Sequence, residues 1–270
     1  MIPMAQPRSL LFVPGDRPER FAKALASGAD AVVVDLEDAV APASKVAARD
    51  ALAGHLVAHA GVVLRINGRD TPWFDDDARA AAHPAIVGVM CPKTSSADDI
   101  AALRSRCADK PVLALVETAL GLACIGAVAA APGVARLVFG SIDFQLDMDI
   151  EDDDEALRPY RAQLVLASRV AGLPAPVDGV TAAIGDAHAL ACDSRRARAS
   201  GFGGKLCIHP AQVAAVNAAF TPSAEQLAWA RRVVAASQAS QGAAVAVDGR
   251  MVDAPVFARA CRLLAAWQQS

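Results

Sequence analysis

Eight short runs of β-forming apolar residues, separated by longer alanine-rich stretches, constrain the fold of this chain more than any other feature. The runs occupy residues 10–13, 31–34, 62–66, 86–90, 112–116, 137–139, 175–177 and 205–208. Strands that alternate with helices favour a parallel sheet, and eight of them favour closure into a (β/α)8 TIM barrel. A doubly wound open sheet is the alternative, but residues 14–18 (PGDRP) lack its glycine-rich phosphate turn.

The length of 270 residues suits one such barrel with a short addition. Residues 238–249 are rich in Ser, Gln, Gly and Ala, which is typical of a linker, and residues 251–268 form an appended tail. We therefore expect a catalytic barrel over residues 1–222. A C-terminal helical extension over residues 223–270 is expected to pack on a neighbouring subunit.

Charge and composition exclude several classes of protein. The net charge is −3 and aromatic residues make up 4% of the chain, which argues against a nucleic-acid-binding surface. The six cysteines form no CxxC pair, as expected in a reducing compartment. No secretory signal pattern opens the chain, and the longest apolar run, 119–131, is too short to span a bilayer. We expect a soluble cytoplasmic protein that does not bind membranes.

Polar residues follow seven of the eight predicted strands. In a barrel of this type, reactive residues lie at the C-terminal ends of the strands, so these residues are candidates for one common site. In chain order they are Asp35, Glu37 and Asp38, then Arg65 and Asn67, then Lys93, Glu117, Asp143, Asp178 and His209.

Glu117 and Asp143 follow consecutive strands and are candidates for a metal site. Neighbouring strands lie roughly 5 Å apart, so the two carboxylates can share one ion. A site of oxygen ligands without imidazole or thiolate favours Mg²⁺ or Mn²⁺. The alternative is that either acid caps the helix that follows it.

Arg65 stands at a strand end, where its guanidinium can grip a substrate carboxylate in a bidentate manner. It can equally form an ion pair with Glu37 or Asp38, and both can hold at once. In that case Glu37 and Asp38 orient Arg65 and metal-bound water. Lys93 is expected either to pair with an acid or to touch substrate, and His209 is expected to bond locally.

Seven stretches of the chain, taken together and in this order, resemble the citrate lyase β-subunit-like (CitE-like) group of the HpcH/HpaI aldolase/citrate lyase superfamily. They are RSLLFVPG (8–15), DLEDAV (35–40), RIN (65–67), PK (92–93), ET (117–118), FGSIDF (139–144) and GKLCIHP (204–210). The resemblance implies a TIM barrel, magnesium bound by Glu117 and Asp143, and Arg65 as the partner of the substrate carboxylate and carbonyl. It also implies a homotrimer or hexamer.

The tail extends this resemblance. Residues 248–255 (DGRMVDAP) resemble the C-terminal segment of the CoA-thioester lyases of the group. That match implies that Asp253 is the catalytic acid/base and reaches the active site of a neighbouring subunit. Arg17, Arg20 and Lys23 lie at helical spacing near the N-terminus, where basic groups of relatives can meet CoA phosphates; an exposed helix face is the alternative.

The hypothesis that follows is a metal-dependent retro-Claisen cleavage of a short 3-hydroxyacyl-CoA that carries a carboxylate. Citramalyl-CoA, giving pyruvate and acetyl-CoA, is favoured because the whole chain most resembles the itaconate-pathway lyases. The alternatives are a citryl-CoA or citryl-carrier-protein lyase, a malyl-CoA lyase or thioesterase, and a binding protein without turnover. The sequence does not choose the acyl group, the general base, Mg²⁺ or Mn²⁺, or trimer or hexamer.

Overall fold

The computed structural model describes residues 6–56, 61–107, 109–152 and 154–268. The chain divides into two compact units, residues 1–217 and 218–270, and each is described by itself. The boundary between them lies slightly before the division at 222/223 that the sequence suggests.

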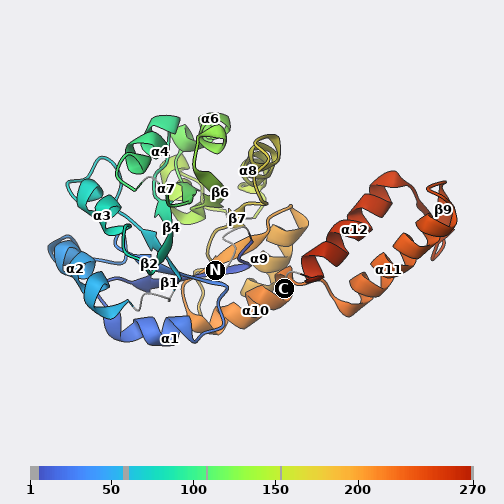
Figure 1. Cartoon of the computed structure of the whole chain (residues 1–270), viewed down its shortest axis with the longest axis horizontal. Coiled ribbons are helices and arrows are strands. Elements are labelled where there is room, and N and C mark those ends of the chain that lie inside the picture. The colour runs from blue at the N-terminus through green and yellow to red at the C-terminus, as the bar shows by residue number, and fades with distance from the viewer. Residues whose placement is uncertain (1–5, 57–60, 108, 153, 269–270) are drawn as a thin grey trace. The chain divides into compact units, whose positions relative to one another are not determined.

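The first unit is a closed barrel of eight parallel strands in chain order, and all eight strands predicted from the sequence are present (Figure 1). Pairing of β1 with β8 closes the barrel. The predicted TIM barrel is therefore confirmed. The strands are β1 (Ser9–Pro14), β2 (Ala31–Asp35), β3 (Val62–Arg65), β4 (Ile86–Cys91), β5 (Val112–Val116), β6 (Val134–Phe139), β7 (Val177–Asp178) and β8 (Gly204–Cys207).

Helices connect the strands and surround the barrel (Figure 1). Several begin at a side-chain cap, as Ser96 and Asp99 show in their reciprocal capping box on α4. The helices are α1 (Phe21–Leu25), α2 (Lys45–His55), α3 (Phe74–Ala80), α4 (Ala97–Arg104), α5 (Ala119–Ala123), α6 (Ile125–Ala130), α7 (Ser141–Met148), α8 (Arg158–Val170), α9 (Ala187–Ala199) and α10 (Pro210–Phe220), with 3-10 turns η1 (Pro18–Arg20) and η2 (Pro42–Ser44) before α1 and α2.

The alternation of side chains along each strand carries the barrel core into the site. Val33 and Val63 belong to the buried apolar cluster inside the barrel. Two residues further along the same strands, Asp35 and Arg65 project from the same face, because successive side chains point to opposite sides. The same spacing takes β5 from Leu115 in the core to Glu117 just past the strand end. The site residues therefore continue the rows of interior-facing side chains that form the barrel core.

The second unit is a helical hairpin with a small sheet. Helices α11 (Ala224–Ala239) and α12 (Ala254–Gln268) lie side by side, joined by the antiparallel strands β9 (Val245–Val247) and β10 (Arg250–Val252) (Figure 1). The prediction of a linker over residues 238–249 was therefore wrong. Asp248 and Gly249 both have positive φ, 50° and 74°, and form the two-residue turn of a β-hairpin.

The tail has its own partner within the chain. Ala260 of α12 is buried together with Ala230 and Val233 of α11 and with Val247 and Val252 of the hairpin. This core explains why residues that read as an appendage form an ordered unit. No helix within the described residues is both long and apolar enough to cross a membrane.

Candidate active site

The barrel brings six of the predicted site residues together at the C-terminal ends of β2 to β6. Arg65 contacts Glu37 and Asp38, with Nη1–Oε2 and Nη1–Oδ2 distances of 2.9 and 3.3 Å. Lys93 Nζ lies 3.2 Å from Glu37 Oε1. The electrostatic influence of Glu37 and Asp143 on Glu117 places the remaining two acids in the same cluster. Four carboxylates and two cations thus share one end of the barrel.

Arg65 is held most tightly by Asp35, a strand-end residue that was not predicted to be its partner. Its Nε and Nη2 donate to the two oxygens of Asp35 at 2.7 and 2.6 Å, a bidentate pair that is almost fully buried. This carboxylate, together with Glu37 and Asp38, raises the pKa of Arg65 despite its burial. The predicted pairing with Glu37 and Asp38 is confirmed, but the strongest contact is with Asp35.

The register of β2 and β3 accounts for the contact between Asp35 and Arg65. Asp35 and Arg65 end adjacent parallel strands and lie opposite each other. Each side chain points into the barrel, like the residue two positions before it in the same strand, so the two side chains meet there. Pairing predicted only from order along the chain missed this contact.

Side chains from other segments hold the backbone of the loop after β2. Lys45 is buried, and its Nζ donates to the carbonyl oxygens of Leu36 and Glu37 at 3.0 and 2.9 Å. Asn67 Nδ2 also donates to Leu36 O, at 2.9 Å. The backbone that carries Glu37 and Asp38 is therefore anchored by two side chains from neighbouring segments.

Glu117 is the most deeply buried acid of the cluster, with 1% of its surface exposed. Its Oε1 accepts a hydrogen bond from the backbone N–H of Lys93 at 2.6 Å, and its buried Oε2 has no hydrogen-bond partner among the described residues. Burial, followed by the charges of Glu37 and Asp143, raises the pKa of Glu117 to about 8. Thr118, and not Glu117, caps α5. A buried carboxylate oxygen without a donor is what a bound cation would satisfy.

Asp143 and Glu37 complete the acidic group. Asp143 is half-buried in the first turn of α7, and burial raises its pKa, with the charge of Asp38 adding to the effect. Burial also raises the pKa of Glu37, to about 7. The described residues contain no group of three or more His, Cys, Asp or Glu arranged around one metal position. Two carboxylates fit Mg²⁺, which keeps several waters and leaves positions for a substrate.

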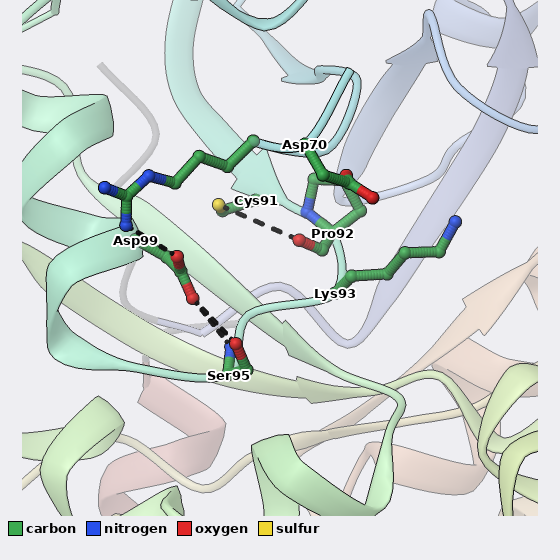
Figure 2. A pocket seen from close by; sticks show the side chains of 7 residues that line it. Asp70, Cys91, Pro92, Lys93, Ser95 and Asp99 are labelled. Carbon is green, nitrogen blue, oxygen red and sulfur yellow. Dashed lines mark hydrogen bonds and ion pairs between the residues drawn. The ribbon is translucent and has the colours of Figure 1, made fainter.

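A cavity of about 450 Å³ adjoins this cluster. Figure 2 shows Lys93 extending away from Asp99 and Ser95, which line the opposite side of the cavity. Asp99 accepts hydrogen bonds from Ser95 and pairs with Arg69 at 3.1 Å. Lys93 therefore stands where the cavity meets the carboxylate cluster.

Two strand-end residues serve other purposes. Asp178 is buried and pairs with the equally buried Arg161 at 3.0 Å. His209 is exposed, and its Nδ1 accepts a hydrogen bond from the backbone N–H of Ala211 at 3.2 Å, as the local role predicted for it requires. Of the ten strand-end polar residues, these two and Asn67, which anchors the loop after β2, have partners outside the carboxylate cluster.

The predicted CoA-binding residues lie apart from these contacts. All three are exposed: Arg17 directly precedes η1, Arg20 lies in η1 and Lys23 lies in α1. Arg17 and Arg20 lie 3.9 and 4.0 Å from their neighbours Asp16 and Glu19. An exposed basic face is what the structure shows, and a role in binding phosphates stays a prediction.

Asp253 belongs to the second unit, whereas the carboxylate cluster belongs to the first. Its Oδ1 accepts from the backbone N–H of Val256 at 3.2 Å, so the side chain caps α12. Asp253 also lines a cavity of about 290 Å³ that includes Gln241 and Phe257. The residue is therefore held in a defined orientation at the edge of a hollow.

The acidic cluster predicts how the stability of the metal-free protein depends on pH. Glu117 has a folded pKa of about 8 against an ordinary value of 4.5, so between these values the folded state binds more protons than the unfolded state. The stability that this group contributes is complete below pH ~4.5 and is lost as the pH rises through ~8. We expect the melting temperature in EDTA to fall across this window. Adding Mg²⁺ at 100 times its Kd should restore about 2.7 kcal/mol at the upper end. A melting temperature that does not change with pH, or that Mg²⁺ does not raise, would contradict the raised pKa of Glu117 and its place in a metal site.

Comparison with known proteins agrees with this geometry. The chain is 41% identical to a citrate lyase subunit beta-like protein of Mycobacterium tuberculosis, covering 94% of this chain and 93% of that protein. It is 38% identical to a (3S)-malyl-CoA thioesterase of Cereibacter sphaeroides, covering 91% and 89%. The crystal structure of CitE from M. tuberculosis in complex with magnesium, acetoacetate and coenzyme A matches with a TM-score of 0.87 and 40% identity, over 98% of this chain and 99% of that one. The family model for HpcH/HpaI aldolase/citrate lyase matches residues 8–210, and the chain belongs to this family.

Proposed function

We propose that this protein is a magnesium-dependent lyase that cleaves a carbon–carbon bond in a short 3-hydroxyacyl-CoA bearing a carboxylate. The observation that supports it most is the buried Oε2 of Glu117, which has no hydrogen-bond partner among the described residues and lies within electrostatic reach of Asp143 and Arg65. The solved relative that contains magnesium, acetoacetate and coenzyme A supports the same class of ligand. The six free cysteines are consistent with a cytoplasmic enzyme.

In this proposal Glu117 and Asp143 hold the divalent ion, Mg²⁺ or alternatively Mn²⁺. The ion, when bound, supplies Lewis-acid polarisation of the substrate oxygens. Arg65 faces the substrate carboxylate and carbonyl and offsets the negative charge that develops there. Asp35, Glu37 and Asp38 keep the guanidinium in place, so its direction is set before substrate arrives.

The bond changes balance as a retro-Claisen cleavage. The hydroxyl group gives its proton to a general base, its oxygen becomes the carbonyl of a 2-oxo acid, and the adjacent C–C bond breaks. The electron pair of that bond passes to the thioester fragment as an enolate. Asp253 in its protonated form gives a proton to the enolate carbon and releases the acyl-CoA. The proton taken from the hydroxyl group equals the one that Asp253 gives up, so the cleavage consumes no proton overall.

The source of Asp253 bears on assembly. It lies in the unit formed by residues 218–270, and we propose that it serves the barrel of a neighbouring subunit in a homotrimer or hexamer. Arg17, Arg20 and Lys23 are proposed to meet the phosphates of CoA, for which their exposure and charge are suited.

Citramalyl-CoA is the substrate that we favour, with citryl-CoA or a citryl-carrier protein and malyl-CoA as the alternatives. Thioester hydrolysis is a second candidate reaction, supported by the identity with a (3S)-malyl-CoA thioesterase. A binding protein without turnover is disfavoured because the acid pair, Arg65 and Asp253 are all present.

The test is a substrate panel on the purified protein with Mg²⁺, Mn²⁺ or EDTA. We expect citramalyl-CoA to give pyruvate and acetyl-CoA in equal amounts, faster than malyl-CoA or citryl-CoA react. Free CoA in excess of acetyl-CoA would indicate hydrolysis. No metal-dependent turnover of any of the three thioesters would refute the lyase proposal.

A further inference from the structure

Lys93 is the one residue of the carboxylate cluster whose backbone lies in the left-handed region, with φ of 48°. Side chains with a Cβ disfavour this conformation, so its presence at a site calls for a reason. In this conformation the backbone N–H of Lys93 donates to Glu117 Oε1 at 2.6 Å. The unusual turn thus delivers a main-chain donor to the most buried acid of the cluster.

The turn is fixed by Thr94, the residue that follows Lys93. Thr94 is fully buried, its backbone N–H donates to Leu115 O at 3.1 Å, and its Oγ1 donates to Cys91 O at 2.8 Å. These bonds tie the turn to the ends of β4 and β5. The left-handed conformation is therefore imposed by the surrounding barrel and does not depend on the lysine side chain.

Gly140 lies against the side chain of Glu117. A Cβ at this position would lie 2.5 Å from Glu117 Oε2 and 2.6 Å from Glu117 Cβ. Its φ of −87° is open to any residue, so the glycine is required for space and not for conformation. Glu117 is thus directed by a donor on one oxygen and by a missing side chain beside the other.

We propose that the left-handed turn at Lys93 and the absent side chain at Gly140 together orient Glu117, and that they thereby set the affinity of the site for its divalent ion. Both are positioning residues. Lys93 acts through its backbone N–H, while its side chain has the separate task of pairing with Glu37. The inference rests on the proposed function in taking Glu117 as a metal ligand.

The first test separates the backbone of Lys93 from its side chain by Mn²⁺ binding, measured by calorimetry and by electron paramagnetic resonance without substrate. Lys93→Gly removes the ammonium group that pairs with Glu37 but keeps the N–H and adopts positive φ readily, so it is the reference for the effect of the turn. Lys93→Val loses the same charge and keeps an N–H, but its branched side chain opposes that φ, and its Kd should be about 10- to 100-fold higher than that of Lys93→Gly. Equal affinity of the two variants would overturn the role of the turn.

The second test changes Gly140 without removing any ligand. Gly140→Ala should weaken Mn²⁺ binding by about 10-fold or more, because Glu117 must move away from the added methyl group. Gly126→Ala in α6 is the matched control, since a Cβ there meets nothing within 4 Å, and it should bind Mn²⁺ normally. Thermal unfolding without metal checks that each variant folds, and Gly140→Ala decides the matter should Lys93→Val not fold.

The outcomes keep this inference apart from the proposed function. Wild-type Mn²⁺ affinity in folded Gly140→Ala would overturn the inference alone. Absence of Mn²⁺ binding by the unmodified chain would overturn the proposed function and the inference with it. Weaker binding by Lys93→Val than by Lys93→Gly, and by Gly140→Ala than by Gly126→Ala, would support it.

Discussion

Glu117→Gln is expected to lower turnover of the acyl-CoA substrate by roughly a thousandfold or more, because it removes the anionic ligand that we propose for the ion. Metal ions stabilise such transition states by several kcal/mol, and each 1.36 kcal/mol is a factor of ten in rate. Glutamine has nearly the same shape, so the hydrogen bond from Lys93 to the Oε1 position can persist. Initial rates over a range of Mg²⁺ concentrations, together with calorimetric Mg²⁺ binding, measure the two effects separately.

The same variant should be more stable than the unmodified protein at pH 8 in EDTA. The buried carboxylate loses its proton as the pH approaches its raised pKa of about 8, and the folded state then contains a buried charge whose Oε2 has no hydrogen-bond partner among the described residues. Glutamine remains neutral, so the fall in melting temperature with pH should flatten. Glu155→Gln, which changes an exposed acid, is the matched control and should leave rate and stability unaltered. Near-normal rate in Glu117→Gln would exclude Glu117 as a metal ligand.

Asp253→Asn is expected to slow C–C cleavage by about 10²- to 10⁴-fold, the range that general acid–base groups contribute. Asparagine can accept the hydrogen bond from Val256 N–H that caps α12, so the second unit should fold normally. Mg²⁺ affinity should not change, because Asp253 is proposed as a proton donor and not as a ligand of the ion. Asp248→Asn in the hairpin turn is the control: asparagine tolerates positive φ, and activity should be retained.

Mixing the two inactive variants tests whether the acid crosses between subunits. Chains with Glu117→Gln still carry Asp253, and chains with Asp253→Asn still carry an intact metal pair. If they are unfolded together and refolded, random assembly should restore roughly a quarter of the unmodified activity when each site draws Asp253 from a neighbour. Activity that stays at the level of the separate variants would place Asp253 and the metal pair in the same chain's site.

The barrel and its acid pair could be predicted from short windows of sequence. Most strands are runs of β-forming residues, several helices are alanine-rich stretches, and Glu117 and Asp143 come just past the strands that position them. These features are local, because propensity and side-chain alternation act over a few residues. The hairpin of β9 and β10 was equally local: its Asp248–Gly249 turn is a strong hairpin signal that a linker-like composition concealed.

Only the tertiary structure decided which polar groups meet. The bidentate pair of Asp35 with Arg65 joins residues 30 positions apart and depends on the register of two strands. Asp178 does not belong to the carboxylate cluster, because it forms an ion pair with a buried arginine of α8. The left-handed turn of Lys93 is imposed by bonds to β4 and β5, against the local preference of the residue. Local propensities specify elements, whereas the partner of a buried charge depends on what long-range packing brings within hydrogen-bonding distance.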